Sequence, residues 1–283
     1  MTPESERRSG RERGFVLLLV LWTLALVALI GTQVTAAGRS ETQIAGNLKA
    51  AAVAEAAADA AVSEAALHLL DASKARWVAG GVYLARLPQA NVEIGITDEA
   101  RRLPVNTAPV ALLTAVVRLA GADPHTAKVL ASQIADWRSP APLPLKLGAK
   151  APQYAAAGRM FGPPNRSIRS LSELRLVLGM TPGLLARLAP HLSAYTETSP
   201  VPAMADPLVR AAMAEVALEG ISPLAFQEAG VFRVVAAATS VGGGRFVRRA
   251  VIRLSGAGGS SAGASPRAFD VLAWWSGDDG EMD

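Results

Sequence analysis

An uncharged apolar run near the start of the chain restricts its fold more than any other feature. The run begins with FVLLLVLWTLALVALIG, and the 24 residues from Phe15 to Gly38 include no charged side chain. As a helix they would measure about 36 Å, at roughly 1.5 Å per residue, which is enough to cross a lipid bilayer. The arm before them carries four arginines against three glutamates, and this slight positive excess favours keeping the arm on the cytoplasmic side. The sequence therefore predicts a membrane-spanning segment.

The helix is predicted to continue far beyond the apolar run. Residues 38–70 are rich in alanine, glutamate and leucine and contain no proline. This composition predicts one unbroken helix to about Leu70. A discarded signal peptide is the alternative, because Val34-Thr35-Ala36 resembles a small-residue cleavage site. The apolar core is longer than in a usual signal peptide and no loop follows it, so we favour an anchor that stays in the working protein.

The junction between the arm and the apolar run matches a known pattern. A short basic arm that ends in Gly14, then Phe15, an apolar stretch and a long amphipathic helix resemble the start of a type IV prepilin. In that family a membrane-embedded peptidase cuts after the glycine and methylates the new amino terminus. The resemblance implies that residues 1–14 are a leader and that Gly14 and Phe15 form the processing site. Glycine suits this position, because a residue without a side chain lets an extended backbone enter a narrow active site.

The fifth residue after Gly14 is Leu19, whereas most pilin-like proteins carry a glutamate there. The absence of that glutamate is typical of the K-type minor pseudopilins of the type II secretion system (general secretion pathway protein K). In pilin-type assemblies the carboxylate neutralises the amino terminus of the subunit above, because a buried unpaired charge is costly. A subunit with Leu19 has no carboxylate to offer upward, so the resemblance implies a position at the filament tip.

The rest of the chain alternates between strand and helix patterns. Two runs of alternating apolar residues between 77 and 103 predict two strands. Residues 104–198 indicate several helices separated by glycine and proline, and residues 199–283 begin with a proline-rich linker and a short helix. Three further strands follow the short helix. The strands on both sides of the helical segment would complete one antiparallel sheet against the N-terminal helix.

Local signals divide the helical segment. Asn106, a capping-type residue, followed by Pro109 predicts a helix start. Ser170 and Glu173 are spaced as a capping box, which predicts a second helix start at Ser170. Residues 139–164 are rich in proline, glycine and alanine and predict a long irregular loop.

The C-terminal strands carry two further signals. Residues 242–244 are three glycines between two strand patterns, so we predict a hairpin turn there and not a phosphate-binding loop. Arg245, Arg248 and Arg249 interleave with apolar residues, which suits an exposed antiparallel strand with one face in water.

This order of elements predicts an α+β, type IV pilin-like fold. A long N-terminal helix would pack on an antiparallel sheet, with a large all-α domain inserted between strands. The predicted boundaries are 1–14 for the leader, 15–76 for the transmembrane and assembly helix, 77–103 for the first β part, 104–198 for the inserted α-helical domain, and 199–283 for the linker helix and the second β part.

Local motifs of the helical segment also resemble the K-type family. Leu103-Pro-Val-Asn-Thr-Ala108 corresponds to an apolar–Asn–Thr–Ala motif, and residues 170–181 match a Ser-x-x-Glu-Leu…Gly-Met signature. A second Asn–Thr–Ala-like motif is degraded at Ser199–Met204, so a role specific to that segment is in doubt.

The resemblance implies a structural role in protein export, at the tip of a periplasmic pseudopilus. The implied partners are the minor pseudopilins of types H, I and J, the major pseudopilin and the prepilin peptidase. The chain would cross the bacterial inner membrane once, with its N-terminus in the cytoplasm and its bulk in the periplasm. A minor pilin of a type IV pilus is the alternative within the same kind of machinery.

Catalytic chemistry is not indicated. The chain has no cysteine, its three histidines are His68, His125 and His191, far apart in sequence, and it contains no nucleotide-binding or hydrolase motif. We predict that it is not an enzyme and has no cofactor. Calcium is possible by family resemblance, and the acidic tail Gly277–Asp283 could supply oxygen ligands. Charged chain ends are usually only solvated, so we assign no metal-binding residue.

A membrane-anchored DNA receptor for competence is the alternative from another class. The segments around Gly121 and Gly179 each resemble half of a helix-hairpin-helix motif, in which backbone N–H groups of a glycine hairpin bind phosphate. The second hairpin glycine is replaced by Asp123 in one segment and Thr181 in the other, and Asp123 would repel phosphate. The net charge is only +4, and the sequence has no run of lysines that could contact several phosphates. We therefore expect no nucleic-acid partner.

Overall fold

One helix dominates the shape of the molecule. The computed structural model describes residues 5–218, 230–254 and 268–277 of the chain. Helix α1 (Ser5–Leu70) extends far beyond the rest of the protein and ends where the sequence predicted. It passes through Gly14 and Phe15 without a break, so the predicted leader boundary is not a boundary of secondary structure.

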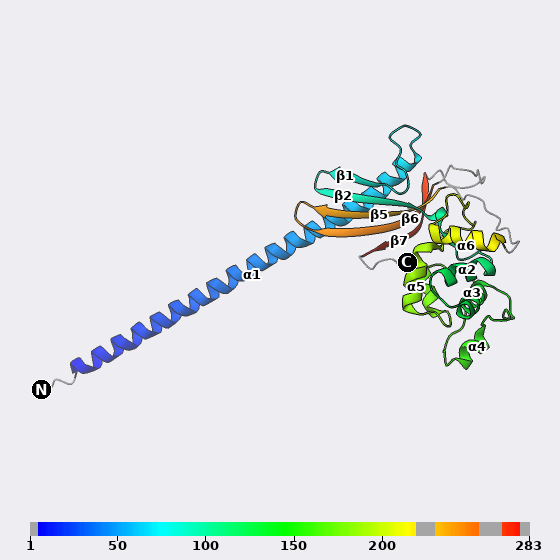
Figure 1. The fold of residues 1–283 in the computed structure, drawn as a ribbon. Helices are drawn as coiled ribbons and strands as arrows, with labels where there is room; N and C mark the ends of the chain where they lie inside the picture. Colours follow the sequence, from blue (N-terminus) through cyan, green and yellow to red (C-terminus); the bar gives the residue numbers. More distant parts are fainter. Residues whose placement is uncertain (1–4, 219–229, 255–267, 278–283) are drawn as a thin grey trace.

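A five-stranded antiparallel sheet lies along the C-terminal part of α1 (Figure 1). Its strand order is β1-β2-β5-β6-β7. The bounds are β1 (Val82–Leu87), β2 (Ala90–Asp98), β5 (Val231–Ser240), β6 (Arg245–Leu254) and β7 (Phe269–Ser276). Strands β2 and β5 pair over their whole length although the helical segment separates them in sequence. The five predicted strands therefore form the single sheet that we expected.

Small side chains join α1 to the sheet. The helix buries alanines at helical spacing, among them Ala54, Ala58, Ala61 and Ala65. The facing strands contribute larger aliphatic side chains, including Val92, Ile94, Val234 and Ile252. Because alternate residues of a strand point to opposite faces, one face of the sheet covers the helix. The alanines allow the backbones of the helix and the sheet to approach closely.

The turn between β5 and β6 also contacts α1. Gly243 has a φ of +83°, a conformation that favours glycine in a tight turn. A Cβ atom on Gly244 would lie only 2.3 Å from the carbonyl oxygen of Ala50. The predicted hairpin turn is confirmed, and its third glycine allows the turn to rest directly on the helix backbone.

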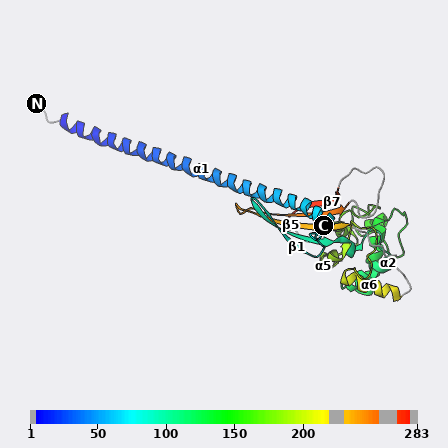
Figure 2. The same cartoon turned by 90° about the horizontal axis from the view of Figure 1, so that it is seen from above.

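The remaining helices gather at the end of the sheet that is remote from the N-terminus (Figures 1 and 2). They are α2 (Val110–Leu119), α3 (Pro124–Arg138), α4 (Ala151–Ala156), α5 (Pro182–Leu188), α6 (Pro207–Leu218) and the 3-10 helices η1 (Glu99–Arg101), η2 (Leu171–Leu176) and η3 (Ala189–His191). All of them except η1 contribute to a second hydrophobic core, separate from that under α1. Helix α6 packs on α2 in this core, although the sequence grouped it with the second β part.

Three details of the helical region differ from the sequence prediction. The region is not purely helical, because β3 (Leu103–Pro104) and β4 (Leu192–Ser193) form a short parallel pair. Helix α4 lies inside the predicted irregular loop 139–164. The element after Ser170 is a 3-10 helix, in which the Glu173 carboxylate accepts a hydrogen bond from the N–H of Arg169.

Candidate functional site

The N-terminal part of α1 is apolar and exposed. The large apolar side chains from Phe15 to Ile30 are between 48% and 73% exposed, on every side of the helix. A helix that is hydrophobic all round needs an apolar environment, supplied by lipid or by other protein. Over the part of the chain whose side chains the structure describes, no helix is both long enough and apolar enough to cross a membrane.

The two predicted processing residues are neighbours in this helix. Phe15 is exposed, and both Gly14 and Phe15 have helical backbone conformation. The bond between them is thus not in the extended conformation that we expected for cleavage. Processing at this bond remains a prediction.

A hollow of about 430 Å³ lies where α1 leaves the sheet. It is formed by the helix and the tips of both hairpins, and its lining residues are Gly46, Lys49, Ala50, Val53, Pro88, Gln89, Ser240, Val241 and Gly242. Ile44 and Leu48, just before it on α1, are exposed. This region presents an apolar helix surface and a depression beside it, which suits packing against another polypeptide.

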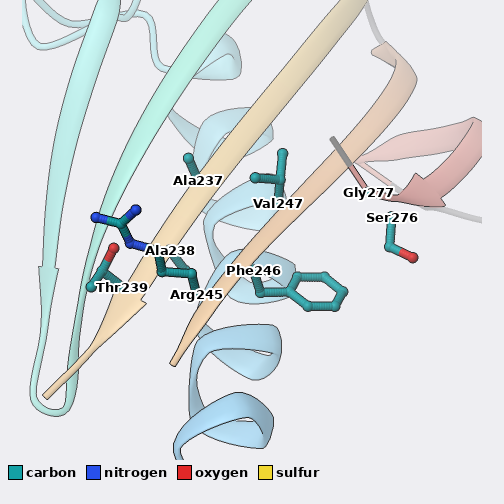
Figure 3. A pocket seen from close by; sticks show the side chains of 8 residues that line it. All are labelled: Ala237, Ala238, Thr239, Arg245, Phe246, Val247, Ser276 and Gly277. Carbon is teal, nitrogen blue, oxygen red and sulfur yellow. The ribbon is translucent and has the colours of Figure 1, made fainter. Parts of the chain in front are cut away.

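A second hollow, of about 540 Å³, lies at the tip of the β5–β6 hairpin (Figure 3). Strand β7 pairs with β6 only as far as Arg248 opposite Ser276, so the first residues of β6 lie at the sheet edge. Figure 3 shows Arg245 near Thr239 and the Phe246 ring pointing the other way. The remaining lining residues are Ala237, Ala238, Val247, Ser276 and Gly277. With no carboxylate or imidazole in this lining, the hollow suits packing better than catalysis.

Arg248 does not lie on a water-exposed face, contrary to the prediction. Its side chain is 8% exposed and points toward α1, where its Nε donates to Asp59 Oδ1 at 2.6 Å and its Nη2 to Glu55 Oε1 at 3.1 Å. The rings of Phe246 and Trp274 lie 4.8 and 4.9 Å from its guanidinium carbon. The two carboxylates neutralise the buried charge, so Arg248 attaches the helix to β6.

A buried ionic cluster joins the sheet to the helical region, and the sequence did not reveal it. Glu99, fully buried after β2, accepts a hydrogen bond from Arg233 Nε at 2.7 Å and lies 3.4 Å from Arg102 Nη1. Burial also raises the pKa of the neighbouring Asp98. Arg233, near the start of the predicted strand 232–241, was the available signal, because a buried arginine in a strand needs a partner.

The degraded segment Ser199–Met204 takes part in the same junction. The Met204 carbonyl accepts a hydrogen bond from Arg101 Nε at 3.0 Å. Just beyond it, the N–H of Asp206 donates to the Arg101 carbonyl at 2.8 Å, and His191 Nδ1 lies 2.7 Å from Asp206 Oδ1. The segment therefore has a structural role in spite of its altered motif.

Asn106 joins chain segments and does not cap a helix. Its side chain donates to the carbonyls of Ile168 and Ala194, and its Oδ1 accepts from the N–H of Ile168 at 2.7 Å. Helix α2 begins after Pro109, which has no side-chain cap. The Asn–Thr–Ala motif thus acts through long-range contacts.

The hairpins that resemble a DNA-binding motif carry their own hydrogen-bond acceptors. Asp123 accepts from the N–H groups of His125 and Thr126 at the start of α3, and hydrogen bonds from Thr126 lower the pKa of Asp123. Thr181 accepts from the N–H of Leu184 at the start of α5. These helix N-termini are therefore already capped where phosphate would have to bind.

Within the described ranges, no group of three or more histidines, aspartates and glutamates could hold a metal ion. Residues 278–283 of the acidic tail, which carry its carboxylates, lie outside the described residues. Calcium binding by the tail stays an expectation from the family resemblance.

Comparison with known proteins identifies relatives of one kind. The family model described as type II secretion system (T2SS), protein K, matches residues 84–197. The type II secretion system protein K of Klebsiella pneumoniae is 29% identical over 211 residues, which cover 66% of this chain and 64% of that protein.

A solved chain shares the fold. It belongs to the crystal structure of the GspK–GspI–GspJ complex from the type 2 secretion system of enterotoxigenic Escherichia coli, and it superposes with a TM-score of 0.62 at 18% identity. The match covers 85% of this chain and 99% of the solved one.

Proposed function

We propose that this chain is a member of the protein K family of the type II secretion system and acts as a minor pseudopilin. In this role it would be a structural subunit at the tip of the periplasmic pseudopilus, needed for protein export, and not an enzyme. The observation that carries the proposal is the division of α1. Its first part is apolar and unpacked, whereas residues from Ala50 to Leu69 are packed on the sheet.

The exposed part of α1 would serve as anchor and then as assembly surface. The uncharged stretch continues in the sequence to Gly38, and its side chains would face lipid before assembly and neighbouring helices afterwards. The chain would then cross the bacterial inner membrane once, with the sheet and the helical region in the periplasm.

We further propose a pilin-like domain built from α1 and the sheet, with an inserted helical domain between β2 and β5. The separate hydrophobic cores support this division. Because α6 packs in the helical core, the inserted domain would extend from residue 104 through α6, beyond the boundary that the sequence indicated.

The proposed partners follow from the relatives. The solved chain was crystallised in a complex of GspK, GspI and GspJ, so we propose minor pseudopilins of types I and J as direct partners. A type H pseudopilin, the major pseudopilin and the prepilin peptidase complete the set. A DNA receptor is less well supported, because Asp123 and Thr181 already occupy the helix N-termini of the two hairpins.

Leu19 supports the position at the tip. The amino terminus of this subunit, at Phe15, can pair with the carboxylate of a subunit below. Leu19 itself has no carboxylate that could pair with the amino terminus of a subunit above. The helical region, at the end of the molecule remote from the N-terminus of α1 (Figure 1), would obstruct a subunit stacked on top. Site-specific cross-linking should therefore find one copy at the filament end, and Leu19→Glu should give no gain in secretion. Cross-links between copies along the shaft would contradict this position.

Processing provides the most direct test of the function. Mass spectrometry of the membrane-extracted protein should show a chain that begins with N-methyl-Phe15, and Gly14→Val should block the cut. A mature terminus near Ala36 or Ala37 would instead indicate a secreted soluble protein and would rule out a pseudopilin.

A further inference from the structure

The loops on either side of α4 expose large apolar side chains. Met160 is 104% exposed and Leu143 78% exposed, and Leu145, Leu147 and Phe161 are exposed to a smaller extent. Single exposed apolar residues are common, but several in adjoining loops indicate an interaction site. We name residues 139–169, with α4 among them, the α4 corner; α4 lies at the outer end of the helical group (Figure 1).

A buried lysine holds these loops in place. Lys150 is 4% exposed, and its Nζ donates to the carbonyls of Asp136 and Ser139 and to Asn165 Oδ1, at 2.7, 2.6 and 2.7 Å. These bonds connect α3, the loop before α4 and the loop after it. All three acceptors are neutral oxygens, which solvate the buried ammonium group in place of water. The α4 corner is therefore an organised surface, and a preorganised surface loses less entropy on binding.

The exposed side chains are attached to this framework. The N–H of Leu145 donates to Asp136 Oδ2 at 3.0 Å, which fixes the first loop between two exposed leucines. The Phe161 ring lies 6.0 Å from that of the buried Tyr154. Two of the exposed apolar residues, Leu145 and Phe161, are thus held by contacts with α3 and α4.

The α4 corner is also basic. Between Asp136 and Glu173 the sequence contains no aspartate or glutamate but six lysines and arginines. Four of them are exposed, namely Lys146, Arg159, Arg166 and Arg169. Arg166 already pairs with Glu173 at 3.4 Å, so Lys146, Arg159 and Arg169 carry most of the argument from charge. Residues 104–198 hold ten basic and four acidic side chains, a net charge of +6 in a chain whose total is only +4. The positive charge of the whole protein is therefore concentrated in the helical region.

We propose that the α4 corner is a docking surface for an acidic polypeptide segment that also carries apolar side chains. Carboxylates would complement the exposed arginines and lysine, and apolar side chains would cover Met160 and the leucines. Duplex DNA fits less well, because leucine and methionine add nothing to phosphate contacts and four cations release few counterions.

Anionic lipid of the anchoring membrane is out of reach in the proposed orientation. In that orientation only residues 39–70 of helix α1 lie outside the membrane. They span about 48 Å at roughly 1.5 Å per residue, and the α4 corner lies beyond the end of the helix that is remote from the N-terminus (Figure 1). This step alone rests on the proposed function; the arguments from charge and apolar exposure do not.

Peptide binding to the detergent-solubilised full chain tests the proposal. The probe is a short fluorescein-labelled peptide of alternating glutamate and leucine. Its binding to the protein is measured by fluorescence anisotropy at physiological ionic strength. We expect binding that weakens several-fold in Arg159→Glu and about tenfold or more when Lys146→Glu and Arg159→Glu are combined. Met160→Ser should weaken it several-fold. Lys128→Glu, an exposed cation of α3 outside the α4 corner, is the matched control and should have little effect.

Lys150→Met tests the framework, because it removes the buried ammonium at similar volume. It should weaken peptide binding while the helix content by circular dichroism stays unchanged. Absence of peptide binding, equal binding of a lysine–leucine peptide, or equal weakening by Lys128→Glu would overturn the proposal. So would tighter binding of mixed-sequence duplex DNA or of phosphatidylglycerol vesicles. None of these results depends on a place in a filament, so they are separate from the processing test.

Discussion

The α1–sheet half and the helical half of the molecule build their cores by different means. Under α1, alanines bring the helix close to the sheet, and the buried Arg248 is neutralised by two carboxylates. The helical half fills its core with leucine, isoleucine and valine, and its buried Lys150 binds only neutral oxygens. Close backbone approach thus matters most in one half and side-chain volume in the other, so each half should be sensitive to a different kind of substitution.

The largest effect should come from a cavity in the helical half. Leu130 is fully buried in the second core, and a buried Leu→Ala change typically costs about 2–5 kcal/mol. Leu130→Ala should lower the unfolding temperature of the helical half and leave the protection of β2 and β5 unchanged in hydrogen exchange. Leu176→Ala, at an exposed position, is the control. Equal loss of protection in both halves would show that they unfold as one unit.

A bulky residue at the hairpin should affect the other half. In Gly244→Val the new side chain would meet the Ala50 backbone, which cannot yield as a flexible side chain can. We expect a loss of about 1–3 kcal/mol, as for other overpacked sites, confined to α1 and the sheet. Gly243→Asn is the matched variant, because nothing lies within 4 Å of that site and asparagine tolerates a positive φ. If both variants behave alike, close contact with α1 is not the reason for Gly244.

A smaller loss is expected from Arg248→Met. The change removes both ion pairs, but the Glu55 and Asp59 side chains are 52% and 39% exposed and can hydrate again. We therefore expect the variant to lose only about 1–2 kcal/mol of unfolding free energy, measured by chemical denaturation. High salt weakens the ion pairs of the wild type, so the difference between wild type and variant should be smaller there. Arg245→Met, at an exposed site of the same strand, should be neutral. A loss independent of salt would assign the role of Arg248 to packing with its two aromatic neighbours.

The smallest effects should come from one exposed carboxylate in each half. Hydrogen bonds from Thr126 lower the pKa of Asp123, and hydrogen bonds from Ser73 lower that of Asp71. A carboxyl group whose pKa is lower in the folded state stabilises the protein above its ordinary pKa of 3.8 and loses that contribution as the pH falls through the folded value. Asp123→Ala should slightly lower the unfolding temperature of the helical half at neutral pH, and Asp71→Ala that of the sheet half. Both differences should shrink in acid; a constant difference would show that charge is not involved.

The sequence predicted features that depend on local pattern and missed those that depend on distant partners. Helix α1 and the five strands follow from composition and periodicity, which neighbouring residues determine. Arg248 and Asp59 are 189 positions apart, so the alternation around Arg248 could not indicate which face of its strand is buried. Asn106 likewise bonds residues 62 and 88 positions away. Helix α4 was hidden in a proline- and glycine-rich segment that Lys150 holds in place through tertiary contacts.

The attachment of α1 to the sheet also has a mechanical consequence. The helix leaves the sheet at Ala50 and is packed on it from there to Leu69. A pull along the helix axis would therefore load the whole contact in shear, and the many small alanine contacts would share the force. A sideways pull would instead peel the contact open from Ala50, one turn at a time. A subunit built this way resists axial traction much better than bending at the point where its helix emerges.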